Sequence, residues 1–128
     1  MGCEPIIHVI DDDTVIRNSL GVLLALEGYL VQTYASARSF LDTIEQTGAG
    51  CILTDFKMPE IDGLDLLARL NERGVFMPVI VMSAFPDAGL EITAMKRGAV
   101  DYFEKPFDPE ILLAAIHTVL TRSHSQIS

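Results

Sequence analysis

Short apolar runs alternate with helix-like stretches along the whole chain, and this alternation constrains the fold more than any other feature. Three of the runs, 6–10, 51–54 and 79–82, are apolar or nearly so throughout, which is typical of strands buried on both faces. Two weaker segments, 30–34 and 102–103, complete a set of five predicted strands. The pattern predicts an α/β domain in which right-handed crossovers join the strands into a parallel sheet with helices on both faces.

The predicted helices are bounded by residues that favour helix ends. Ser36 is expected to cap the second helix, which we predict to end near Gly48. The fifth helix opens with Asp108-Pro109-Glu110, which supplies a capping oxygen, a proline at the first helical position and an acid near the positive end of the helix dipole. Glycines are expected to end the first, third and fourth helices, at Gly28, Gly74 and Gly98.

Length and composition indicate one compact domain. A chain of 128 residues has room for a single core. We expect the domain to span 1–122, with 123–128 as a C-terminal tail or the start of a linker to an absent output domain. The net charge of −9, without a cluster of Lys and Arg, excludes direct binding of nucleic acid by this chain as the expected function.

The cellular compartment is predicted from what the chain lacks. Two cysteines, Cys3 and Cys51, are too few for a disulfide framework, so a reducing environment is expected. No apolar run approaches the length that a bilayer requires, and the first residues do not resemble a signal peptide. We therefore expect a cytoplasmic protein that makes no contact with membranes.

Acidic, hydroxyl and lysine side chains follow the predicted strands. Asp11-Asp12-Asp13 follows the first strand, Asp55 the third, Ser83 the fourth and Lys105 the fifth. Ligands of open parallel sheets bind at the carboxyl ends of the strands. If the first, third, fourth and fifth strands are neighbours, these groups converge in one crevice.

Such a crevice is suited to a divalent cation. Clustered carboxylates resist ionisation unless a cation joins them, and oxygen ligands of this kind favour Mg²⁺ or Mn²⁺. The cation would also offset the charge of an incoming phosphoryl group, whose other oxygens Ser83 and Lys105 could contact. A flavin or nucleotide site is not expected, because those sites cradle phosphate with a Gly- or Ser-rich turn, and here the turn carries three negative charges.

Each of these residues also has an ordinary structural interpretation. The Asp triplet could be a capping turn, Asp55 the start of a loop, Ser83 a turn residue and Lys105 a surface lysine. The occurrence of all four after different strands favours a site.

Four motifs, in this order, resemble those of response-regulator receiver domains over essentially the whole chain. They are the acidic pocket at 8–13, the phosphoacceptor loop at 55–59 with Asp62-Gly63, the hydroxyl position at Ser83-Ala84 and the lysine motif at Lys105-Pro106-Phe107. The resemblance implies a three-layer, doubly wound, flavodoxin-like fold with strand order 2-1-3-4-5. The stretches 9–13 and 98–107 are most similar to receivers of nitrogen-fixation regulators, which usually carry a helix-turn-helix output domain that controls transcription.

The resemblance assigns roles in phosphorylation. Asp55 would accept a phosphoryl group from a phosphohistidine of a sensor kinase. Asp12 and Asp55 would bind Mg²⁺ or Mn²⁺ directly, and Asp11 would act mainly through water. The backbone carbonyl of Lys57 would be the third protein ligand, and the Lys57 side chain could influence attack of water on the acyl phosphate. The domain would thus assist its own phosphorylation and dephosphorylation without being an enzyme.

The resemblance also assigns roles in switching. Ser83 and Lys105 would bind the phosphoryl oxygens, and Tyr102 would change rotamer when Ser83 moves, although core packing is the commoner role of a strand aromatic. The family has a cis peptide in its lysine motif, here Lys105-Pro106. Phosphorylation would favour a homodimer through the fourth helix, fifth strand and fifth helix. That face carries charges which could otherwise be ordinary solvated groups: Arg97, Asp101, Glu104, Asp108 and His117.

Two other functions compete with this one. Asp11-x-Asp13 followed by Thr14-Val15 resembles the nucleophile motif of haloacid-dehalogenase phosphatases, but 83–87 holds one carboxylate where that family has a pair, and its cap has no room. A receiver-like binding module without phosphorylation is disfavoured, because every acidic, hydroxyl and lysine position is filled.

Overall fold

Five parallel strands form one sheet in the order β2-β1-β3-β4-β5, as expected. The computed structural model describes residues 5–44, 49–84 and 87–127, the last six by their backbone alone. The strands match the predicted runs closely, and β3 and β4 extend just far enough to include the polar residues that follow those runs. Their bounds are β1 Ile6–Ile10, β2 Leu30–Tyr34, β3 Gly50–Asp55, β4 Val79–Ser83 and β5 Asp101–Glu104.

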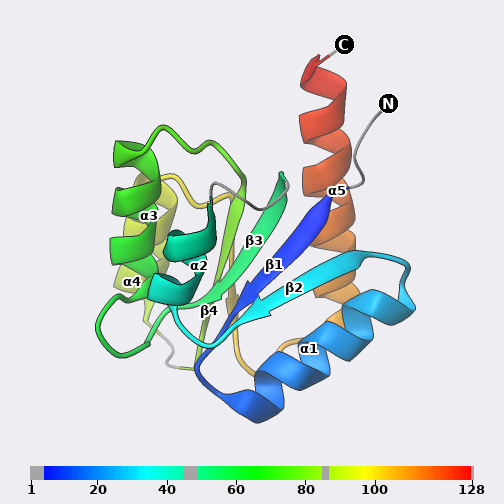
Figure 1. The fold of residues 1–128 in the computed structure, drawn as a ribbon, viewed down its shortest axis with the longest axis horizontal. Helices are drawn as coiled ribbons and strands as arrows, with labels where there is room; N and C mark the ends of the chain where they lie inside the picture. The colour runs from blue at the N-terminus through cyan, green and yellow to red at the C-terminus, as the bar shows by residue number, and fades with distance from the viewer. Residues whose placement is uncertain (1–4, 45–48, 85–86, 128) are drawn as a thin grey trace.

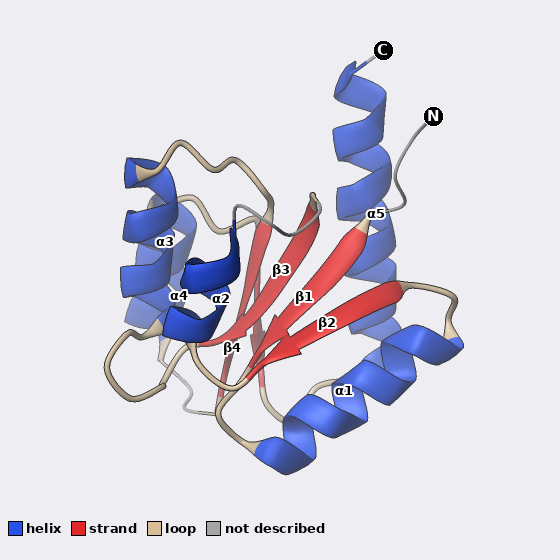
Figure 2. Cartoon of the chain, in the orientation of Figure 1, coloured by secondary structure: helices blue, strands red, loops and turns tan. Residues whose placement is uncertain are grey.

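Helices cover both faces of the sheet, which gives the three expected layers. In Figures 1 and 2, α1 and α5 lie on one face, while α2, α3 and α4 lie on the other. The bounds are α1 Thr14–Leu26, α2 Ala37–Thr43, α3 Gly63–Glu72, α4 Ala88–Lys96 and α5 Pro109–Ile127.

The sheet separates two apolar cores. Successive residues of a strand point to opposite faces, so Ile52 of β3 belongs to the core under α2, α3 and α4, and Leu53 belongs to the core under α1 and α5. Both side chains are fully buried. Phe40 and Leu66 complete the first core from the helix side, and Leu24 does so for the second.

Most helices end where the sequence predicts, and α2 ends earlier. Gly28, Gly74 and Gly98 adopt positive φ after α1, α3 and α4, where the missing Cβ removes the steric penalty. Ser36 caps α2 by accepting from the Ser39 amide, but α2 ends at Thr43, earlier than predicted, and Gly48 lies outside the described residues.

Helix α5 continues to Ile127. No glycine or proline lies between residue 110 and its end, so no residue stops it. The expected domain boundary at residue 122 falls inside this helix. Within the described part of the chain, no helix combines the length and apolar character needed to span a bilayer. Cys51 is buried in β3, and Cys3 lies outside the described residues.

Candidate phosphorylation and metal site

The acidic turn after β1 is held by hydrogen bonds around Asp11. Asp11 is fully buried, and its amide donates to the carbonyl of Tyr34 in β2 over 3.1 Å. One carboxylate oxygen, Oδ1, accepts the amide of Asp13 at 2.9 Å, and the backbone carbonyl accepts Nη1 of Arg17 at 2.7 Å. Asp12, by contrast, is exposed. The turn therefore presents one fixed carboxylate and one that faces solvent.

Asp55 is the last residue of β3, where strand register brings it next to its neighbours. It pairs with Met82 of β4, and the following amide, of Phe56, donates to the Met82 carbonyl at 2.7 Å. Gly63 begins α3 directly against this backbone, because a Cβ there would lie 3.1 Å from the Asp55 carbonyl oxygen. The side chain of Asp55 is only 12% exposed.

Three carboxylates and one ammonium converge at this point. Single oxygens of Asp11, Asp12 and Asp55 lie within 4.8 Å of one another. Lys105 Nζ is 2.9 Å from Asp11 Oδ2 and 3.0 Å from Asp55 Oδ1. Three negative charges and one positive charge leave a formal charge of −2 in a mostly buried space.

The charge imbalance affects the ionisation of two groups. Burial raises the pKa of Asp55 above its ordinary value, the nearby Asp11 and Asp12 raise it further, and the hydrogen bond from Lys105 only partly opposes this. Burial alone would lower the pKa of Lys105, but its hydrogen bonds with Asp11 and Asp55 outweigh burial and raise it. At neutral pH Lys105 is therefore a cation, and the Asp55 carboxylate is less stable than one in water.

Ser83 and Lys105 come together through the backbone. Ser83 ends β4 and is buried, and its carbonyl accepts the Lys105 amide at 2.7 Å. The peptide between Lys105 and Pro106 is cis, as the resemblance implies. The hydroxyl-bearing residue and the lysine thus flank Asp55 from the β4 and β5 side of the sheet.

The remaining predicted residues lie near the cluster or behind it. Asp13 faces away from it and caps α1, because its Oδ1 accepts the amides of Val15 and Ile16. Lys57 lies in the loop that follows Asp55, with an exposed side chain. Tyr102 of β5 is buried in the core under α3 and α4, and its hydroxyl has no hydrogen-bond partner within the described chain.

Sequence reasoning missed two residues that hold the acidic turn. Arg17 is visible in the sequence as the cation four residues after Asp13, a spacing that places it one helical turn further along. Tyr34 acts through its backbone carbonyl. Its ring packs against Phe40, and its hydroxyl shares a hydrogen bond of 3.0 Å with His8 Nδ1. No side-chain signal could have revealed that backbone contact.

The donor set fits a small divalent cation. Carboxylate oxygens are the ligands that Mg²⁺ and Mn²⁺ favour, usually with one or two protein carboxylates and several waters. Both oxygens of Asp11 already accept hydrogen bonds from Asp13 and Lys105, while Asp12 is exposed. A divalent charge would also balance the formal −2 of the cluster.

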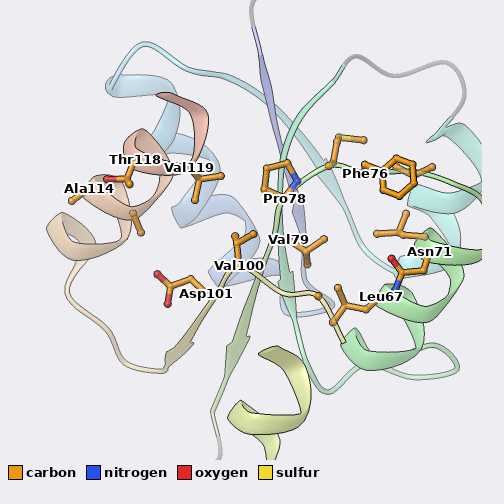
Figure 3. Close-up of a pocket in the computed structure, with 15 residues that line it drawn as sticks. Leu67, Asn71, Phe76, Pro78, Val79, Val100, Asp101, Ala114, Thr118 and Val119 are labelled. Atoms are coloured by element: carbon orange, nitrogen blue, oxygen red, sulfur yellow. The ribbon is translucent and has the colours of Figure 1, made fainter. Parts of the chain in front are cut away.

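A groove of about 760 Å³ lies at the opposite end of the sheet, away from these carboxylates. Figure 3 shows Val79, Val100 and Asp101, at or next to the starts of β4 and β5, between α5 and the end of α3. The side chain of Phe76 at its rim is 87% exposed. The groove holds one carboxylate and no lysine among its lining residues, so it lacks the charge pattern of the cluster.

Comparison with known proteins points to one family. The sequence profile of the response regulator receiver domain matches residues 7–117. The transcriptional regulatory protein FixJ of Azorhizobium caulinodans is 48% identical over 120 residues, covering 94% of this chain and 57% of that protein. The response regulator protein TmoT of Ectopseudomonas mendocina is 38% identical over 123 residues, covering 96% of this chain and 56% of its own length.

Solved structures agree with the sequence relatives. The crystal structure of FixJ-N superposes with a TM-score of 0.87 at 32% identity, covering 94% of this chain and 96% of that one. Full-length FixJ from B. japonicum gives 0.88 at 37% identity, covering 94% of this chain and 60% of that one. The chain thus spans little more than half the length of these curated relatives.

Proposed function

The chain belongs to the response regulator receiver domain family of two-component signalling, and from that premise we propose that Asp55 accepts a phosphoryl group in a Mg²⁺-dependent reaction. The observation that carries the proposal is the convergence on Asp55 of two further carboxylates and Lys105. A carboxylate nucleophile needs an ionised oxygen, a cation to offset the charge of the incoming group and a defined path of approach. The cluster supplies the groups for each of these needs.

The metal would be held mainly by Asp12 and Asp55. Asp11 acts through water, because both of its carboxylate oxygens already accept hydrogen bonds within the protein. The backbone carbonyl of Lys57, in the loop after Asp55, completes the protein ligands. When bound, Mg²⁺ offsets the negative charge of the phosphoryl oxygens. With so few protein ligands the ion stays hydrated and exchanges readily, so weak binding is expected.

Lys105 and Ser83 bind the transferred group. In the unphosphorylated protein Lys105 Nζ bridges Asp11 and Asp55. When Asp55 becomes an acyl phosphate, Lys105 keeps a partner by moving its hydrogen bond from the carboxylate to a phosphoryl oxygen. Ser83, the last residue of β4, donates its hydroxyl to another of these oxygens. The domain in this way assists its own phosphorylation and dephosphorylation.

The phosphoryl donor is a phosphohistidine of a sensor kinase, which needs a surface beside the site. Val15 in the first turn of α1 is 73% exposed, and Ile111 in the first turn of α5 is 57% exposed. Both helices start next to the strand ends that carry the cluster and cover the same face of the sheet (Figure 1). A kinase that covers these apolar side chains would bring its histidine to Asp55.

The acceptor is tested by intact mass after treatment with acetyl phosphate and Mg²⁺. One added phosphate is expected on the parent protein and none on Asp55→Asn. Borohydride trapping followed by peptide mapping then identifies the labelled residue. A label on Asp11 or Asp13 would instead support the phosphatase alternative, which the capping role of Asp13 disfavours.

Phosphorylation is proposed to act through Tyr102 and the face formed by α4, β5 and α5. Tyr102 is already buried, with its hydroxyl unpaired, and an unsatisfied buried hydroxyl costs about 1–3 kcal/mol. A shift of Ser83 toward the phosphoryl group changes the surroundings of this ring, so two packings of similar free energy are available.

Self-association is the proposed output of this switch. Ile92 and Met95 of α4 are exposed, and so are the charged or titratable residues Arg97, Glu104 and His117. Within the described chain these three charged or titratable side chains form no ion pair. Apolar and charged groups of this kind can pair across a two-fold axis.

The switch is tested by sedimentation with and without beryllofluoride, which mimics the phosphoryl group. A larger dimer fraction is expected with the mimic, and Met95→Glu should abolish the increase. An unchanged monomer fraction across a broad concentration series would rule out dimerisation as the output.

The role of the longer protein is inferred from its relatives. FixJ is named as a transcriptional regulatory protein, and the matched relatives are almost twice as long as the region they share with this chain. We infer that this receiver acts in the cytoplasm and controls transcription through an output domain joined after α5.

A further inference from the structure

Arg17 stands where simple electrostatics disfavours a cation. It lies near the start of α1, and the positive end of the helix dipole disfavours cations there. It is also next to the proposed Mg²⁺ site, where a second positive charge opposes the ion. The guanidinium is nevertheless held in place, with Nη1 2.7 Å from the Asp11 carbonyl oxygen and Nη2 3.4 Å from Thr14 Oγ1.

The carbonyl that Arg17 binds belongs to the peptide that joins Asp11 to Asp12. The orientation of this peptide sets the direction in which the Asp12 side chain leaves the backbone. The other contacts of the turn fix Asp11 and Asp13: the Asp11 carboxylate accepts from Lys105, and Asp13 caps α1. The Asp12 carboxylate makes no hydrogen bond to another described residue, so its position depends on the backbone that carries it.

We propose that Arg17 is a positioning residue for the metal site, which keeps the Asp12 carboxylate within reach of Asp55 by holding the Asp11–Asp12 peptide. The proposal rests on the function proposed above. Hydrogen bonds to ionised groups are short and strong, and 2.7 Å is among the shortest side-chain contacts of the turn. Outer contacts that orient metal ligands typically change metal affinity by about 10–100-fold when they are removed.

The direction in which the affinity for a divalent cation changes when Arg17 is replaced distinguishes a positioning role from a purely electrostatic one. If Arg17 acts only through its charge, its removal strengthens binding of a divalent cation, because a repulsion is lost. If Arg17 positions Asp12, its removal weakens binding. Arg17→Met removes the charge and keeps the apolar stem, whereas Arg17→Lys keeps the charge but has no planar fork to reach both oxygens.

Calorimetric titration of the phosphate-free protein with Mg²⁺, repeated with Mn²⁺, measures the affinity in each variant. We expect Arg17→Met to bind about tenfold more weakly than the parent, with Arg17→Lys in between. Arg69→Met is the matched control, since it removes one positive charge from the last turn of α3, at the far end of that helix from Asp55. Its affinity should equal that of the parent.

Phosphorylation by acetyl phosphate gives an independent readout. In Arg17→Met the Mg²⁺ concentration for half-maximal rate should rise about tenfold, while the rate at saturating Mg²⁺ returns to the parent value. Unchanged or tighter Mg²⁺ binding by Arg17→Met would overturn the positioning role. If the parent protein and Asp12→Ala bind Mg²⁺ equally, the metal site itself fails, and the proposed function fails with it.

Discussion

The two ends of the central strands are built from opposite kinds of side chain. Near their amino ends, β3 and β4 bury apolar groups, including Ile52 and Val79. At their carboxyl ends the same strands finish with buried polar groups, Asp55 and Ser83. Burial of apolar surface stabilises a fold, whereas burial of a charge costs free energy unless it is paired. Within one strand, therefore, stability and function occupy neighbouring positions.

The largest effect is expected from truncating the apolar end of β3. Ile52 is fully buried in the core under α2, α3 and α4. Ile52→Ala should lower the free energy of unfolding by about 2–5 kcal/mol, because it removes buried methyl groups and leaves a cavity. Urea denaturation measures the change, with Ile92→Ala on the exposed face of α4 as the control. If Ile52→Ala lowered the free energy of unfolding by no more than the control does, the apolar end of β3 would not be the source of stability that the comparison of the two strand ends requires.

Three residues further along the same strand, a substitution of Asp55 should raise the free energy of unfolding instead of lowering it. Burial and the neighbouring carboxylates raise the pKa of Asp55 in the folded protein. The folded state therefore holds a proton more tightly than the unfolded state, and stability falls as pH rises from the ordinary Asp pKa to the raised one. Asp55→Asn removes this loss. In EDTA at neutral pH we expect it to be more stable than the parent by about 1 kcal/mol.

Two conditions sharpen this second comparison. Below the ordinary pKa of Asp the parent carboxyl is protonated in both states, so the difference between parent and Asp55→Asn should vanish there. Excess Mg²⁺ should narrow the difference at neutral pH, because the ion binds and stabilises the folded parent in preference to the variant. Denaturation curves at several pH values, with EDTA or Mg²⁺, test both conditions. A variant less stable than the parent in EDTA would show that the Lys105–Asp55 pair outweighs the cost of burial.

The sequence predicted the apolar end of the strands better than the polar end. Strand β1 has the bounds that its apolar run predicts, because continuous apolar character is a local property of the sequence and is typical of a strand buried on both faces. Asp11, Asp55, Ser83 and Lys105 were predicted from their place after different strands. Their roles in phosphoryl transfer came from the family resemblance and remain proposals.

What the sequence could not predict depends on contacts between distant segments. The bond between the Asp11 amide and the Tyr34 carbonyl joins β1 to β2 through backbone atoms alone. The exposure of Ile92 and Met95 on α4 depends on how that helix packs, which the sequence does not state. Helix α5 runs past the expected domain boundary at residue 122, in a segment whose composition suggested a tail but which contains no glycine or proline to end the helix.

Backbone strain is also distributed unequally between the two ends. Gly74 and Gly98, which adopt positive φ near the amino ends of β4 and β5, have no Cβ to strain. At the carboxyl end, Glu60 lies in the loop between Asp55 and α3 and has a φ of 71°. Among the described residues, it is the only one other than glycine with a positive φ. The Ile61 amide donates to the Pro59 carbonyl at 2.8 Å, which closes a tight turn around Glu60.

The smallest effect is expected from relieving that strain. Glu60→Gly should raise the free energy of unfolding by about 0.5 kcal/mol, because the steric cost of positive φ disappears. The greater freedom that glycine gives the unfolded chain offsets part of this gain. The change also removes the ion pair of Glu60 Oε2 with Arg38 Nε, 3.0 Å apart. Both partners are half exposed, so this pair contributes little. Arg38→Ala removes the pair without touching the turn and gives its contribution separately. If Glu60→Gly destabilises the protein by more than Arg38→Ala does, Glu60 is not strained, and the two ends of the sheet do not differ in this respect.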